Sequence, residues 1–241
     1  MQLNGKMVLV TGGTDGIGAQ LIRQLRDNGA SVITSGRTAE RIAATRADGF
    51  EVIEADLSTH TGVDMLVKAV EGRTIDALIN NAGAGVDHDF RETGLPDLAA
   101  ADATIFLNLN APIHLISALM PTLKSRPEAM IVNVTSGLAI APMAGSPVYC
   151  ATKAALRSYT MALRAQLKDT AVHVLEVLPP VVETKMTAGV TSGKLPASEC
   201  ARQIVNAIER GADQANVGMV KLLQLVHSIS PALARRIMLR F

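Results

Sequence analysis

The stretch Val10–Leu25, VTGGTDGIGAQLIRQL, joins a short apolar, β-prone run to a segment with helical periodicity. Its glycines Gly12, Gly16 and Gly18 stand at the junction between the two. Glycines there let the backbone approach a ligand closely, and a helix N-terminus offers free N–H groups and a positive dipole to a phosphate. The spacing differs from the usual G-x-G-x-x-G, and glycines at such a turn can be purely structural. After the first strand of a strand–helix–strand unit, however, this pattern predicts a nucleotide-binding turn.

Short apolar runs alternate with helix-prone segments along the chain. The runs are apolar throughout, which is typical of strands covered on both faces. The expected strands are Met7–Val10, Ser31–Ser35, Phe50–Ala55, Ile75–Asn80, Met130–Thr135 and Val172–Leu178, with a last strand near Asn216–Val220. The expected helices lie near Ile17–Asn28, Ala39–Ala47, Gly62–Glu71, Leu95–Leu123 and Tyr149–Lys168, and helical character returns from Ser198. This order predicts an α/β fold: a single Rossmann-type domain over residues 1–241, with a doubly wound parallel sheet flanked by helices on both faces.

The composition excludes several kinds of protein. Hydrophobic residues make up 48% of the 241 residues, which is enough to form a buried core. The net charge of +1 provides no field that would attract nucleic acid. The two cysteines give no disulfide framework, and the five histidines show no metal-ligand spacing. Asparagines and prolines interrupt the most apolar window, Ile105–Leu123, so we expect a cytoplasmic protein without a membrane span, a metal or a nucleic-acid partner.

The end of the second expected strand, SVITSGRTAER, indicates which nucleotide the turn accepts. A carboxylate there would hydrogen-bond the adenosine ribose and repel a 2′-phosphate. This chain has Gly36, Arg37 and Thr38 instead, which leaves room for the phosphate and supplies a guanidinium to hold it. NADP(H) is therefore expected rather than NAD(H), although Asp15 opposes a phosphate unless it faces solvent near the helix start. Asp56, after the third strand, either accepts a hydrogen bond from the adenine amino group or caps a turn.

The stretch SPVYCATKAAL at residues 146–156 carries a phenol and an ammonium one helical turn apart. Tyr149 and Lys153 share one face of the expected helix. Ser136 ends the strand MIVNVTSG thirteen residues before Tyr149, and the carboxyl ends of parallel strands face the ligand crevice. These three side chains are therefore expected to converge. Cys150 follows the tyrosine, and we interpret it as a small buried thiol rather than a nucleophile, because no histidine stands beside it.

Two further motifs, NNAG at Asn80–Gly83 and NLNAP at Asn108–Pro112, accompany the glycine turn and the Ser–Tyr–Lys set. In this order the motifs resemble those of the short-chain dehydrogenase/reductase family, and the resemblance runs from about residue 5 to Thr187. The segment VLPPVVETKMT and the tail ANVGMVKLLQLVHSISPALARRI are further similar to the DltE-type branch of that family.

The resemblance implies a role for each site residue. Tyr149 would be the catalytic acid/base, and Ser136 would hydrogen-bond the substrate oxygen. Lys153 would lower the phenol's pKa from its ordinary value of about 10 and hold the nicotinamide ribose. Asn108 would be the fourth catalytic residue and support a proton-relay water. Pro180 departs from the glycine that many members have in this turn. The cofactor-binding residues implied by the motifs and the resemblance are Gly12, Thr14, Asp15, Gly16, Ile17, Gly18, Arg37, Thr38, Asp56, Leu57, Asn81, Ala82, Gly83, Tyr149, Lys153, Val182 and Thr184.

The activity implied by the resemblance is hydride transfer between NADP(H) and a small-molecule carbonyl or secondary alcohol. Two alternatives stay open: a catalytically silent NADP-binding regulator, and an epimerase or dehydratase that acts through a transient ketone. A mainly apolar loop at about residues 184–197 is expected to meet the substrate. Residues 216–241 are expected to pack on the core or on a partner subunit rather than lie as a membrane-surface helix. The resemblance also implies a homodimer or homotetramer.

Overall fold

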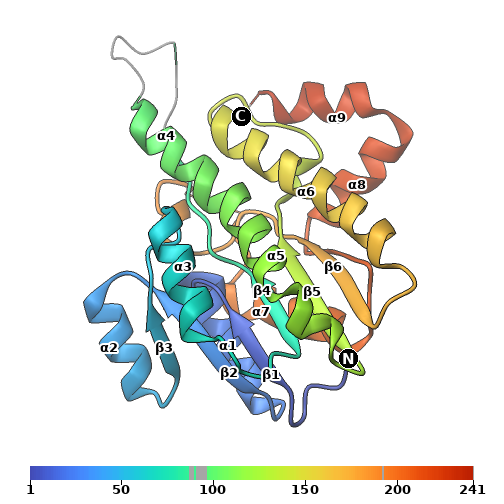
Figure 1. Ribbon diagram of the computed structural model, residues 1–241. Coiled ribbons are helices and arrows are strands. Elements are labelled where there is room, and N and C mark those ends of the chain that lie inside the picture. Colours follow the sequence, from blue (N-terminus) through green and yellow to red (C-terminus); the bar gives the residue numbers. More distant parts are fainter. Residues whose placement is uncertain (87–89, 91–96, 192, 241) are drawn as a thin grey trace.

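The computed structural model describes residues 1–86, 90, 97–191 and 193–240, and its centre is a parallel sheet (Figure 1). Its strands are β1 (Met7–Val10), β2 (Ser31–Gly36), β3 (Glu51–Glu54), β4 (Ala77–Asn80), β5 (Ala129–Val134), β6 (Val172–Leu178) and β7 (Gln214–Asn216). Their order is β3-β2-β1-β4-β5-β6-β7, and each neighbouring pair is parallel. The strand order reverses between β1 and β4, which is where open α/β sheets bind their ligands.

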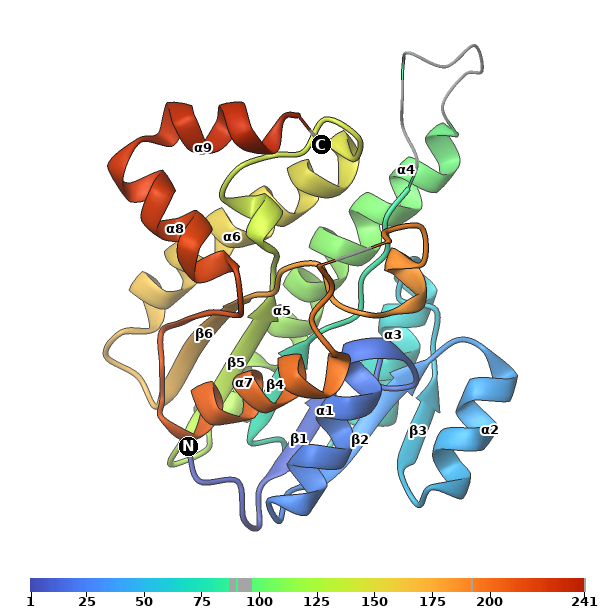
Figure 2. The ribbon, with the colours of Figure 1, turned by 180° about the vertical axis from the view of Figure 1, so that it is seen from behind.

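Helices cover both faces of this sheet (Figures 1 and 2). They are α1 (Gly16–Asp27), α2 (Ala39–Ala47), α3 (His60–Ala69), α4 (Leu98–Ile105), α5 (Ala111–Lys124), α6 (Pro147–Leu167), α7 (Ala197–Glu209), α8 (Val220–Ile229) and α9 (Pro231–Met238). Helices α1 and α7 pack against each other on one face, whereas α3, α5 and α6 lie on the other. The predicted doubly wound α/β fold is confirmed.

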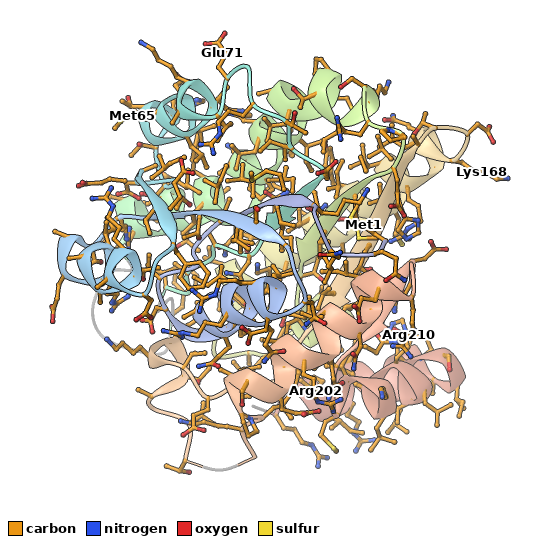
Figure 3. The ribbon with its side chains drawn as sticks, turned by 90° about the horizontal axis from the view of Figure 1, so that it is seen from below. Met1, Met65, Glu71, Lys168, Arg202 and Arg210 are labelled. Carbon is orange, nitrogen blue, oxygen red and sulfur yellow. The ribbon has the colours of Figure 1, made fainter. Side chains whose placement is uncertain are left out.

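Each face of the sheet has its own core, because successive strand residues point to opposite faces. Val8 and Val10 of β1 belong to the core with α1 and α7, whereas Leu9 between them packs with α3 and α5. Figure 3 shows side chains filling the space on both sides of the sheet. Burial on both faces explains why the strands are apolar throughout.

The last strand was predicted at the wrong residues. The sequence places it at 216–220, but β7 covers Gln214–Asn216. Gly218, with a φ of 54°, then turns the chain, and Val220 already begins α8. Val217 and Val220 are buried at this turn, so an apolar pattern that looks like a strand comes from the packing of a turn.

The long helix predicted for residues 95–123 is divided. Residues 95 and 96 lie outside the described part of the chain, and the remainder consists of α4, a π-helical segment (Phe106–Asn110) and α5. The N–H of Ala111 bonds to the carbonyl of Phe106, five residues back. Such wide turns often occur at functional sites, and this one contains the fully buried Asn108.

The helical stretch Leu98–Lys124 is long and apolar enough to span a membrane, judged by length and composition alone. Its inner side belongs to the core between the sheet and α3, where Leu115, Ile116 and Leu123 are buried. A core helix passes the same test, so the stretch is a structural part of the α/β fold.

Helices α8 and α9 lie at the outer edge of the molecule (Figures 1 and 2). Val220 and Ala234 are buried against the rest of the chain, but most of the large apolar side chains of both helices are exposed. Packing on the core, as expected for residues 216–241, therefore accounts only for the inner side of these helices. Residue 241 lies outside the described residues, and contact with a partner subunit stays a prediction.

Candidate functional site

The glycine-rich turn leads from β1 into α1. Gly12 and Gly16 have φ values of 68° and 54°, which residues with a Cβ rarely adopt. A Cβ on Gly18 would come within 2.1 Å of the Gly12 carbonyl oxygen, so α1 approaches the turn very closely. Asn81, after β4, donates to the carbonyls of Thr11 and Gly12 at 2.9 and 3.2 Å. These contacts hold a turn that presents the start of α1 to an anionic ligand.

A cleft of about 350 Å³ begins at this turn and extends along the carboxyl ends of the strands. Gly16 lies just behind the cleft, and a Cβ added to Gly16 would come within 3.0 Å of Thr184 Cγ2. Asn108 lies behind Gly83. The structure therefore brings the predicted site residues into one place. Those that line the cleft are Gly12, Thr14, Asp15, Ile17, Gly18, Arg37, Thr38, Asp56, Leu57, Asn81, Ala82, Gly83, Ser136, Tyr149, Lys153, Val182 and Thr184.

An ion pair that the sequence did not predict lies at the start of α1. Arg41 Nη1 is 2.8 Å from Asp15 Oδ2, and Asp15 also caps α1 by accepting from the N–H of Gly16 at 2.8 Å. The charge of Asp15 is thus balanced and does not by itself oppose a phosphate. Sequence reasoning missed Arg41, because its partner Asp15 lies at the start of another helix and residue spacing does not show a contact between separate elements.

A second ion pair joins Arg37 to Asp56, with 3.4 Å between Nη1 and Oδ1. Asp56 also accepts hydrogen bonds from the N–H and the hydroxyl of Ser58, at 3.1 and 2.8 Å. Burial favours a higher pKa for Asp56, but the bonds from Ser58 and the charge of Arg37 outweigh it and leave the pKa below its ordinary value. Of the two interpretations of Asp56, the structure shows the turn cap. A contact with an adenine amino group stays a prediction.

Ser136, Tyr149 and Lys153 meet in the cleft although they come from two separate segments. Ser136 follows β5, its hydroxyl accepts from the N–H of Leu138 at 3.1 Å, and it lines the cleft together with Tyr149. The buried Lys153 lies one turn further along α6, with its Nζ 5.7 Å from the centre of the Tyr149 ring. The expected convergence is thus present in the structure, while the catalytic roles of these residues stay predictions.

The structure does not show the expected lowering of the Tyr149 pKa. Burial raises the pKa of Tyr149 to about 12, although the neighbouring Ser136 hydroxyl opposes this shift in the pKa. Burial also lowers the pKa of Lys153 to about 8. The ammonium of Lys153 donates to the carbonyl of Val134 at 2.9 Å and lies beside the ring, so it does not offset the desolvation of the phenol.

Asn108 is held rigidly behind the cleft. Its Oδ1 accepts from the N–H of Ala84 at 2.9 Å, and its Nδ2 donates to the Ala84 carbonyl and the Thr152 hydroxyl at 2.8 and 3.1 Å. A Cβ on Gly83 would lie 3.2 Å from Asn108 Oδ1 and 3.4 Å from Lys153 Nζ. A glycine therefore keeps the space between the amide and the ammonium open. The water relay implied by the resemblance stays a prediction.

The segment that follows β6 forms the remaining wall of the cleft. Val182 is buried and forms a parallel bridge with Leu195, which ties the two ends of the predicted substrate loop at 184–197 together. Residue 192 of this loop lies outside the described residues. Pro180 lines the cleft, so the departure from glycine at this position affects the wall itself.

A mostly buried ion pair joins α6 to β6 behind Ser136, Tyr149 and Lys153. Arg157 Nη1 lies 2.8 Å from Glu176 Oε2, and the Thr135 hydroxyl donates to Glu176 Oε1 at 2.9 Å. Glu176 is 0% exposed, and burial raises its pKa although Arg157 opposes the shift. Because Thr135 directly precedes Ser136, this network connects the helix that carries the tyrosine and lysine to the strand end that carries the serine.

The buried thiol predicted at Cys150 is confirmed. Its Sγ accepts from the N–H of Met143 at 3.4 Å, and burial raises its pKa, which keeps the thiol protonated and unreactive. Within the described part of the chain, no three His, Cys, Asp or Glu side chains are grouped to hold a metal ion. His88 lies outside that part.

Comparisons with known proteins identify the family. The short chain dehydrogenase family matches residues 6–195 of the chain. An oxidoreductase named DltE from Bacillus subtilis (strain 168) is 36% identical over 224 residues, which cover 89% of this chain and 88% of that protein. A serine 3-dehydrogenase from Agrobacterium fabrum is 32% identical over 208 residues, which cover 83% of this chain and 82% of that protein.

A solved structure agrees with this assignment. A short chain dehydrogenase from Burkholderia cenocepacia J2315, in complex with NADP, has a TM-score of 0.88 and 28% identity, with 99% of both chains covered. The chain belongs to the short-chain dehydrogenase family and is similar to its DltE-type branch. It is therefore an oxidoreductase built on a Rossmann-type nucleotide-binding fold.

Proposed function

We propose that this oxidoreductase transfers a hydride between NADP(H) and the carbonyl or secondary alcohol carbon of a small molecule. The observation that supports this most directly is the convergence of Ser136, Tyr149 and the buried Lys153 in the same cleft as the glycine turn. The name of the serine 3-dehydrogenase relative supports dehydrogenation as the reaction class. A screen of carbonyl compounds for NADPH oxidation tests the proposal, and product analysis distinguishes reduction from epimerisation or dehydration. NADPH binding without any turnover would favour the silent regulator.

The residues present fit a dinucleotide cofactor. The glycine turn and the start of α1 suit a pyrophosphate, and Arg37 and Arg41 suit a 2′-phosphate at the other end. Gly83 leaves open the approach to Lys153, which would hold the nicotinamide ribose. The NADP complex of the Burkholderia protein supports NADP(H) over NAD(H). When bound, the nicotinamide supplies or accepts the hydride.

The chain's own residues hold the reacting oxygen and move its proton. In reduction the Tyr149 phenol donates its proton to the substrate oxygen, and in oxidation it takes that proton back. The Ser136 hydroxyl holds the same oxygen within reach of the phenol. Lys153, with a pKa of about 8, is mostly charged at neutral pH and stabilises the phenolate as it forms. Asn108, fixed by Ala84 and Thr152, supports the lysine from behind Gly83.

Arg37→Ala is expected to raise the Kd for NADPH about ten- to a hundredfold, and the Kd for NADH by much less. The substitution removes one charge-assisted hydrogen bond to the 2′-phosphate, which NADH does not have. Calorimetric titration with both cofactors measures this. The matched control is Arg23→Ala, because Arg23 is an exposed arginine that pairs with Asp48 and does not line the cleft. Equal losses for NADPH and NADH would exclude a contact between Arg37 and the 2′-phosphate.

The role of Arg41 can be separated from that of Arg37. If Arg41 acts by balancing Asp15, Arg41→Ala weakens NADPH binding and the double variant Asp15→Asn/Arg41→Ala restores it. Asparagine still caps a helix, so α1 is preserved in the double variant. If Arg41 contacts the phosphate directly, the double variant stays as weak as Arg41→Ala.

Cofactor binding is expected to take up protons above about pH 8. The pKa of Lys153 is lowered to about 8 by burial, so the free side chain loses its proton as the pH rises through that value. An anionic dinucleotide favours the charged form, so binding returns the proton and its affinity falls as the pH rises. At pH 7 the side chain is already charged and little uptake follows. Calorimetry in two buffers of different ionisation enthalpy, at pH 7 and pH 9, measures the uptake. Lys153→Met should abolish it, and uptake that persists in this variant would assign the proton to another group.

A further inference from the structure

The outer side of α8 and α9 carries large apolar side chains that nothing in the described chain covers. On α8, Leu222, Leu225 and Ile229 follow one another at helical spacing and are 53%, 56% and 78% exposed. On α9, Leu233 and Ile237 lie one turn apart and are 48% and 42% exposed. We call these five side chains, together with the exposed Met219 and Leu239 at the helix ends, the C-terminal apolar surface. In Figure 3 both helices lie at the periphery, with side chains projecting away from the sheet.

Cations surround this surface without any acidic residue among them. Lys221 lies beside Leu222 on α8. Arg236 lies three residues after Leu233 and so shares its side of α9, and Arg240 follows the end of that helix. Arg235 adds a further charge, and residues 217–240 contain no Asp or Glu. All four cations are exposed, and within the described residues none of them forms an ion pair. The surface is thus both apolar and purely cationic.

This charge distribution argues against a second copy of the chain as the occupant. In a two-fold contact a surface meets itself, so the cations of one copy would face those of the other with no carboxylate between them. Like charges that face each other across an interface carry an electrostatic cost. An anionic partner removes this cost.

A lipid leaflet that carries anionic headgroups fits both properties. Helices that lie in such an interface bury leucine and isoleucine side chains among the acyl chains and direct lysine and arginine towards the headgroups. With 10 and 8 residues, α8 and α9 are too short to span a bilayer, which takes about 20 residues. Their arrangement therefore suits an element that lies on the membrane rather than one that crosses it.

We propose that the C-terminal apolar surface binds this protein to the surface of an anionic membrane. The membrane contact is structurally connected to the catalytic cleft, because the segment at the start of α8 packs against the walls of the cleft. Gly218 lies against Pro180, where a Cβ would be 3.4 Å from the ring, and a Cβ on Gly137 would come within 2.9 Å of Val220 Cγ2. Because α8 starts at these walls, the cleft lies beside the C-terminal apolar surface. A carbonyl compound dissolved in the membrane would then reach the site over a short path.

Sedimentation of the full chain with vesicles tests the proposal. One set of vesicles consists of phosphatidylcholine and the other of equal parts phosphatidylcholine and phosphatidylglycerol. Binding is expected to the mixed vesicles, to be far weaker to the neutral ones, and to fall as salt screens the cations. Arg235→Gln/Arg236→Gln is expected to weaken binding to the mixed vesicles about thirtyfold, since each cation near an anionic surface contributes about five- to sixfold. Leu225→Ser/Ile229→Ser is expected to abolish it.

The matched control is Lys124→Gln/Lys168→Gln, which removes two exposed cations at the far ends of α5 and α6 and should leave binding unchanged. Thermal melts and NADPH titration establish that each variant is folded. Binding that does not distinguish the two kinds of vesicle, or that survives in the surface variants, would overturn the proposal. The proposal would also be overturned if the protein did not bind vesicles but formed a dimer that Leu225→Ser/Ile229→Ser dissociates. The surface would then be a subunit contact. None of these measurements depends on turnover.

Discussion

Tyr149→Phe is expected to lower kcat for carbonyl reduction by about 10²–10⁴-fold, the usual contribution of a positioned acid or base. The substitution removes the phenol's hydroxyl and its proton but keeps the ring in the wall of the cleft. With a pKa of about 12 in the structure, Tyr149 is protonated at neutral pH, which suits the acid in reduction. The Kd for NADPH should change little, since the glycine turn, Arg37 and Lys153 are intact. Initial rates of NADPH oxidation and calorimetric titration measure the two quantities.

The control for this experiment is Tyr159→Phe. Tyr159 is the only other tyrosine in the sequence and lies ten residues later on α6, packed against the core on the side of α3 and α5. Removing its hydroxyl should leave kcat unchanged. If Tyr149→Phe retained activity comparable to that of Tyr159→Phe, the acid/base assignment would be wrong.

The fold was predictable because its strands are buried on both faces. A strand such as β1 packs Val8 and Val10 on one core and Leu9 on the other, so its sequence is apolar at each position. The glycine turn was also predictable, because the close approach of Gly18 to Gly12 excludes a Cβ. Where the apolar pattern had another cause, as at the buried turn before α8, the same reasoning placed the last strand at the wrong residues.

The sequence predicted which residues share the cleft, but not their pKa values or their ion pairs. Motifs show which residues share the cleft, whereas a pKa depends on burial and on the direction of each charge. The ammonium of Lys153 donates to the Val134 carbonyl, so burial dominates and raises the Tyr149 pKa instead of lowering it. The pairing of Arg41 with Asp15 and the exposure of α8 and α9 depend on how separate elements are oriented. The spacing of residues within one element does not contain that information.

A buried carboxylate inside a central strand is unfavourable in free energy, and the fold itself does not require one. Glu176 lies in β6, between β5 and β7, and is 0% exposed. Its two oxygens accept from Arg157 and from Thr135, so the charge is paired and hydrogen-bonded. Apolar residues of similar volume commonly replace such buried pairs without loss of stability. The pair lies directly behind Ser136 and the helix that carries Tyr149 and Lys153, so we infer that it positions them.

Glu176→Ala is expected to lower the free energy of unfolding by about 3–5 kcal/mol, because it leaves the mostly buried charge of Arg157 without a partner. The double variant Arg157→Met/Glu176→Leu, which replaces both charges by apolar side chains, is expected to recover most of this loss. Urea unfolding followed by circular dichroism measures both. Asp48→Ala, which breaks the exposed pair with Arg23, is the matched control and should have a much smaller effect. A small loss in Glu176→Ala would mean that water reaches the pair.

The double variant Arg157→Met/Glu176→Leu also separates stability from positioning. It is expected to restore most of the free energy of unfolding, but it lacks the ion pair and hydrogen bond that would position Ser136. In it Thr135 has lost the carboxylate that accepts its hydroxyl, and the neighbouring Ser136 is no longer tied to α6 through the ion pair. Small displacements of a group that holds the substrate can cost up to about a hundredfold in rate. We therefore expect a variant with near-native stability and unchanged Kd for NADPH but a kcat lowered about tenfold or more. A native kcat in this variant would limit the pair to a structural role, because the serine and the tyrosine would then meet correctly without it.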